Sequence, residues 1–94
     1  YENTTVKMGI IYPENLTAVF IPKLLDGTRG KVIFEVAHAN PNATIFWHID
    51  DVFIAQTTRE HKIDIQLASG EHLLTLVDEY GSELIRKFNV LEKK

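Results

Sequence analysis

Apolar and polar residues alternate with a period of two along much of the chain. The clearest example is "KIDIQL" at residues 62–67, in which Ile63, Ile65 and Leu67 alternate with Lys, Asp and Gln. Successive side chains of a β-strand point to opposite faces, so this alternation predicts a half-buried strand. Runs rich in β-branched and apolar residues predict further strands at 31–37 and 72–77 and within 6–12, 17–21 and 83–90.

Turn signals separate these strands. They are Pro13-Glu14-Asn15, Asp26-Gly27, Asn40-Pro41-Asn42, Ser69-Gly70 and Tyr80-Gly81. No window carries a helical period of useful length, and "PKLLDG" at 22–27 could form one helical turn at most. Seven or eight short strands at this spacing predict an all-β fold, an antiparallel Ig-like β-sandwich. We expect one domain over residues 1–94 with its core within 6–91.

The stretch "IFWHIDDVFIAQT", from Ile45 to Thr57, raises the question of a site. The simplest interpretation is a two-residue hairpin closed by Asp50-Asp51, since Asp tolerates positive φ better than most residues. That register would pair Ile49 with Val52, Trp47 with Ile54 and Ile45 with Gln56. Trp47 would then be the largest contributor to the core.

The opposite face of this hairpin carries Phe46, His48 and Phe53. An exposed apolar patch of this kind can be a contact surface, and these three residues are the candidate interaction surface. Two alternatives stay open. A neighbouring loop or the N-terminal segment could cover the patch, or His48 could act with Asp50 and Asp51 as a ligand or acid/base group.

Composition limits the function classes. The hydrophobic fraction of 45% and charged fraction of 24% are those of a globular domain. The net charge of −3 argues against nucleic-acid binding, and no apolar run is long enough to span a membrane. Zero cysteines exclude a disulfide framework and a thiolate metal site.

The remaining histidines, His38, His61 and His72, show no metal-binding spacing, and scattered surface histidines are the simplest interpretation. Phosphate loops, nucleophile elbows and the Ser-x-x-Lys element of penicillin-reactive enzymes are missing as well. We therefore expect no catalytic residues, no metal and no cofactor. A small metal-dependent enzyme that uses the histidines is a remote alternative.

Several motifs resemble a known family. "LASGEHLLTLVDEYG" at 67–81 is similar to the L-x-x-G-x-H-x-L-x-V-x-D-x-x-G pattern in the C-terminal domain of bifunctional penicillin-binding proteins of the 1C type. "IFWHIDDVFIA" at 45–55 resembles that family's L-x-W-x-L-(D/N)-G hairpin, and "IYPENLT" at 11–17 resembles its opening I-x-x-P-x-x-G. "RKFNV" at 86–90 matches its closing strand. Asp51 and Leu16 stand where the family often has Gly.

The resemblance implies a non-catalytic, Ig-like accessory domain in the periplasm, at the C-terminal end of a peptidoglycan synthase anchored in the inner membrane. Because the chain begins at Tyr1, we expect it to be a piece of a longer protein. Its expected partners are the rest of the synthase and a cell-wall partner protein or peptidoglycan, with no membrane contact of its own. A carbohydrate-binding module that uses exposed aromatic residues is the alternative function.

Overall fold

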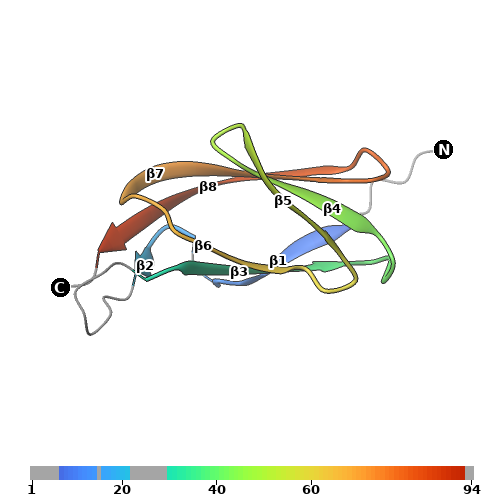
Figure 1. The fold of residues 1–94 in the computed structure, drawn as a ribbon, viewed down its shortest axis with the longest axis horizontal. Helices are drawn as coiled ribbons and strands as arrows, with labels where there is room; N and C mark the ends of the chain where they lie inside the picture. The colour runs from blue at the N-terminus through green and yellow to red at the C-terminus, as the bar shows by residue number, and fades with distance from the viewer. Residues whose placement is uncertain (1–6, 15, 22–29, 93–94) are drawn as a thin grey trace.

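Two β-sheets face each other in the computed structural model, which describes residues 7–14, 16–21 and 30–92 (Figure 1). The smaller sheet has the order β1 (Met8–Tyr12), β3 (Val32–His38), β6 (Lys62–Ile65). The larger sheet has the order β2 (Val19–Ile21), β8 (Glu83–Glu92), β7 (Gly70–Asp78), β4 (Thr44–Ile49), β5 (Val52–Thr58). The prediction of an all-β sandwich is confirmed.

One strand pair departs from the expected antiparallel arrangement. Strand β2 lies parallel to β8, with Val19 beside Val90 and Ile21 beside Glu92. The chain changes sheets between β1 and β2, and β2 then forms the edge of the larger sheet next to β8 (Figure 1). The predicted helical turn at 22–27 lies outside the described residues.

The core fills the space between the two sheets. Trp47 is fully buried and is the largest of the fully buried side chains, as predicted. Phe34 of the smaller sheet meets Phe88 of the larger one edge to face, with ring centroids 5.3 Å apart. Such aromatic contacts stabilise the fold beyond the effect of the apolar area that each ring removes from water. The predicted inward positions of Leu74 and Leu76 are confirmed, since both are fully buried.

The β4–β5 hairpin has a different register from the predicted one. Ile49 faces Val52 as expected, but a bulge shifts the pairing between Trp47 and His48. Trp47 therefore pairs with Ala55 and not with Ile54, and Ile45 pairs with Thr57 and not with Gln56. A bulge places two residues of one strand opposite one of its partner, and simple alternation cannot predict it.

The turn between these strands is as predicted. Asp50 has φ of 53° and Asp51 has φ of 68°. Positive φ at both central residues is what a type I′ hairpin turn requires. The acidic pair thus closes the hairpin.

Candidate functional site

The three residues of the candidate interaction surface lie together on the outer face of the larger sheet. His48 pairs directly with Phe53, and their rings meet edge to face at 5.7 Å between centroids. Phe46 lies two positions from His48 on the same face of β4. Phe53 is 55% exposed, whereas Phe46 and His48 are half-buried. The part of the patch that is open to solvent is therefore centred on Phe53.

The sheet extends this surface across two further strands. Register places Thr75 of β7 beside His48 and Ile85 of β8 beside Thr75, while Val77 lies beside Phe46. Ile85 is 47% exposed. We call the six residues the hairpin face: Phe46, His48, Phe53, Thr75, Val77 and Ile85. Sequence reasoning missed the last three because strand pairing over long sequence separations sets which residues adjoin.

No acid/base pair forms on the hairpin face. The Nδ1 atom of His48 is buried and has no hydrogen-bond partner, and the hydrogen bonds of Asp50 go to His72 and Leu73. His48, Asp50 and Asp51 therefore do not form a joint site, and residues 45–57 are two strands and a turn. What this face presents is an aromatic and aliphatic surface.

The prediction of scattered surface histidines is wrong. The side chain of His38 is 1% exposed, that of His72 is 13% exposed, and His61 as a whole is 6% exposed. Each of these three has a specific polar partner. Nothing in their sequence spacing indicates this, because each partner lies on a different strand or turn.

His38 forms a buried pair with Asp78. Its Nε2 lies 2.8 Å from the Asp78 carboxylate, and both side chains are almost inaccessible to solvent. The backbone N–H of Asn40 donates to Nδ1 of His38 at 2.9 Å. Since Nδ1 must accept that bond, the ring is neutral and its hydrogen resides on Nε2, from which it is donated to Asp78.

Asp78 also organises the turn that follows β7. One of its oxygens accepts the backbone N–H groups of Tyr80 and Ser82, each at 2.9 Å. The predicted turn from Asp78 to Gly81 is confirmed by the bond from Gly81 N to Asp78 O at 3.1 Å. Burial raises the pKa of the Asp78 carboxyl, but the bonds from His38, Ser82 and Tyr80 together outweigh burial, and the net pKa is lowered.

His72 has the opposite protonation chemistry. Its Nδ1 lies 2.6 Å from the Asp50 carboxylate, and its Nε2 lies 2.7 Å from the carbonyl oxygen of Ala68. Both neighbours are acceptors, so both ring nitrogens donate when the ring is an imidazolium. Burial lowers the pKa of His72, but the bonds to Asp50 and Ala68 overcome burial and raise it on balance. The ring also stacks on Phe88.

His61 belongs to a third group beneath the hairpin. The Trp47 indole N–H donates to Thr57 Oγ1 at 2.8 Å, and that hydroxyl lies 2.7 Å from Nδ1 of His61. Nε2 of His61 is buried without a partner. Burial lowers the pKa of His61. The residue is therefore a neutral, structural histidine.

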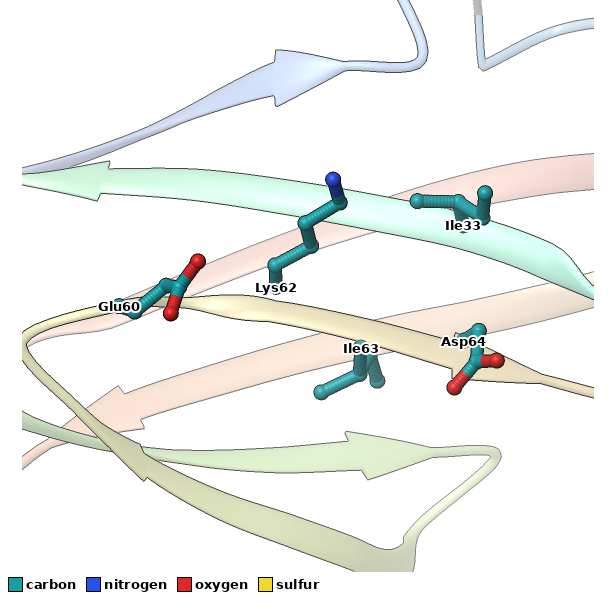
Figure 2. A pocket seen from close by; sticks show the side chains of 5 residues that line it. All are labelled: Ile33, Glu60, Lys62, Ile63 and Asp64. Carbon is teal, nitrogen blue, oxygen red and sulfur yellow. The ribbon is translucent and has the colours of Figure 1, made fainter.

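A depression on the smaller sheet brings no set of reactive groups together. Figure 2 shows this depression of about 340 Å³ on the outer side of β3 and β6, where Lys62 extends beside Ile33 between Glu60 and Asp64. These charged side chains are exposed to solvent. Within residues 7–14, 16–21 and 30–92, no three His, Asp or Glu side chains gather closely enough to hold a metal ion.

Comparison with known proteins identifies the family to which the chain belongs. The family described as the Penicillin-Binding Protein C-terminus Family matches residues 2–88, which is most of the chain. The chain belongs to this family. No curated protein and no solved structure gave a match. Membership in a penicillin-binding protein family indicates a protein of the cell envelope.

The family motifs quoted above coincide with the polar groups of the sandwich. His72 of the G-x-H motif bonds Asp50 of the hairpin motif, and Asp78 of the D-x-x-G motif bonds His38. Gly70 and Gly81 adopt φ of 121° and 91°, which glycine tolerates best. The motif residues therefore specify turns and inter-strand contacts.

Among the described residues, no helix is long and apolar enough to cross a bilayer.

Proposed function

We propose that this domain is a non-catalytic, C-terminal accessory domain of a peptidoglycan synthase and acts in the periplasm. Its role is to dock a cell-wall partner protein, or to position the rest of the synthase, through the hairpin face. The observation that carries this proposal is the exposure of Phe53 on an aromatic and aliphatic surface, in a chain of the penicillin-binding protein C-terminus family.

The physical argument concerns the character of this surface. Aromatic residues are enriched at the centre of protein interfaces, where they provide large contact areas at low entropic cost. Phe53 is supported from below by the His48 ring, so its orientation is constrained before a partner binds. The polar groups deeper in the domain are occupied in holding strands and turns. The Thr57 hydroxyl lies beside the His61 imidazole, but it also accepts the Trp47 indole N–H and so belongs to this structural network.

The experiment replaces Phe46 and Phe53 by Ala in the parent synthase. We expect the double variant to lose partner recruitment or correct localisation while glycan polymerisation by the synthase persists. Tyr12→Ala is the matched control, because Tyr12 is 52% exposed but lies on β1 of the smaller sheet. Unchanged recruitment and localisation in the Phe46/Phe53 variant would overturn the proposal.

The alternative role of the hairpin face is to grip glycan through its aromatic rings. Sedimentation of the domain with purified peptidoglycan separates the two roles. Under this alternative the Phe46→Ala/Phe53→Ala variant would no longer sediment with the glycan. If the variant sediments as well as the unmodified domain, the hairpin face is not the glycan-binding surface.

A further inference from the structure

A second depression lies at the other end of β4 from the Asp50-Asp51 turn. It has a volume of about 390 Å³ and is lined by Lys7, His38, Ala39, Asn40 and Tyr80. Protein pockets that bind small molecules commonly have volumes of roughly 300–1,000 Å³. The depression is separate from the hairpin face because Asn40 precedes β4, whereas Phe53 follows the turn at its far end. Binding in this depression would therefore be independent of the docking role of the hairpin face.

The walls of this depression are held in place before any ligand arrives. The Asn40 side-chain amide donates to the Tyr80 hydroxyl, and the Asn40 side-chain oxygen accepts the backbone N–H of Asn42 at 2.9 Å. The backbone N–H of Tyr80 is held by Asp78. Two segments far apart in the sequence thus present one fixed pair of side chains.

The buried His38–Asp78 pair joins these two segments from below. Asp78 holds the turn that carries Tyr80, and His38 accepts the backbone N–H of Asn40. The 2.8 Å hydrogen bond between His38 and Asp78 therefore connects the two segments, and it is buried where water cannot replace either partner. A site fixed in this way loses little conformational entropy when it binds.

The chemistry of the wall selects a class of ligand. Tyr80 is 60% exposed and presents a flat aromatic ring. Asn40 retains a second amide hydrogen that its bond to Tyr80 does not use. Lys7 supplies an ammonium group, and among the described residues no carboxylate lies within ion-pair distance of it. The backbone carbonyl of Lys7 accepts the N–H of Ala39 at 2.8 Å.

The depression thus combines three groups that suit a sugar acid. An aromatic ring can stack on the sugar, an amide can bond hydroxyl or acetamido groups, and a cation can pair with a carboxylate. We propose that this depression binds a saccharide that carries a carboxylate. The sugar ring stacks on Tyr80, its polar substituents bond Asn40, and its carboxylate faces Lys7. A nucleic acid is the less favoured ligand because the chain carries a net charge of −3 and phosphate binding requires a basic surface.

The test is a titration of the 94-residue chain, followed by amide chemical shifts in NMR. The probes are N-acetylmuramic acid, its carboxylate-free relative N-acetylglucosamine, and D-lactate. We expect saturable shifts around Ala39, Asn40 and Tyr80 with N-acetylmuramic acid, and weaker binding of the other two probes. Shifts centred on Phe53, no saturable shifts, or equal binding of D-lactate would overturn the proposal.

Matched variants assign the binding to named side chains. Tyr80→Ala should weaken binding of N-acetylmuramic acid by about tenfold, whereas Tyr12→Ala should leave it unchanged. Lys7→Met should weaken it by about two- to fivefold, the range of one exposed ion pair, and Lys87→Met should not. Both target side chains are exposed, and well-dispersed amide spectra verify the fold. Equal effects of target and control variants would contradict the assignment.

Discussion

Nδ1 of His72 lies 2.6 Å from a carboxylate oxygen of Asp50, and this contact joins the start of β7 to the turn between β4 and β5. The other Asp50 oxygen accepts the backbone N–H of Leu73 at 2.8 Å, and the Asp50 N–H donates to the Leu73 carbonyl. Asp50 therefore has two functions. It adopts the positive φ that closes the β4–β5 hairpin, and it ties that hairpin to the start of β7.

The His72–Asp50 pair predicts a stability that falls at alkaline pH. The pKa of His72 is raised above its ordinary value of 6.5, so its contribution is complete below that pH and is lost as the pH rises through the folded-state pKa. The pKa of Asp50 is lowered, mainly by the His72 bond, so its contribution is lost only in acid. Asp50→Asn should remove the alkaline loss.

Urea unfolding at about pH 5.5 and pH 8.5 measures this loss. Its expected size is at most about 1 kcal/mol, since the Asp50 side chain is 48% exposed and solvent screens the pair. Asp51→Asn is the control and should behave like the unmodified protein. An equal alkaline loss in Asp50→Asn and the unmodified protein would show that another group is responsible.

Thr57→Val should destabilise the protein by about 1–3 kcal/mol, because it leaves the Trp47 indole N–H and the His61 ring without their shared partner in the interior. Thr58→Val is the matched control. Thr58 is exposed, and its hydroxyl is hydrogen-bonded to the Thr44 hydroxyl in the adjacent strand, so loss of the Thr58 hydroxyl should cost less than about 0.5 kcal/mol. Thermal or urea unfolding distinguishes the two, and similar losses would contradict the buried network.

Asp78→Asn should cost about 1–3 kcal/mol although it preserves shape. An Asn oxygen can still accept the bonds from Tyr80 and Ser82, but its NH₂ group then faces the Nε2–H of His38. His38 cannot move its hydrogen to Nδ1 without opposing the N–H of Asn40.

The control for this substitution is Glu79→Gln, which keeps an oxygen for the bond from Thr44 N. It is exposed and should be nearly neutral. Unfolding free energies from denaturant titration provide the comparison. A neutral Asp78→Asn would mean that His38 exchanges its tautomer freely.

Asp51→Gly should stabilise the hairpin by about 0.5–1 kcal/mol, since Asp51 holds φ of 68° and Gly is the favoured second residue of a type I′ turn. Asp50→Gly tests the opposite case. It relieves similar backbone strain but removes the bonds to His72 and Leu73, so a net loss is expected. Differential scanning calorimetry of both variants reveals the contrast, and equal shifts in Tm would refute the separate roles.

The sequence by itself determined the all-β class, the strand positions, the acidic hairpin turn and the burial of Trp47. These follow from local physics, because the period-two alternation fixes which side chains face the core and turn residues fix where the chain reverses. The resemblance of the motifs also determined the family, as the match over residues 2–88 confirms. Phe46, His48 and Phe53 were placed on one face by alternation alone.

Only the tertiary structure decided the rest. The bulge beside Trp47, the parallel β2–β8 pair and the extension of the hairpin face to Ile85 depend on pairing between distant strands. The three histidine groups depend on it too, since His38 and Asp78 are 40 positions apart. A hydrogen bond acts over about 3 Å, and no local pattern records which distant atoms the fold brings within that range.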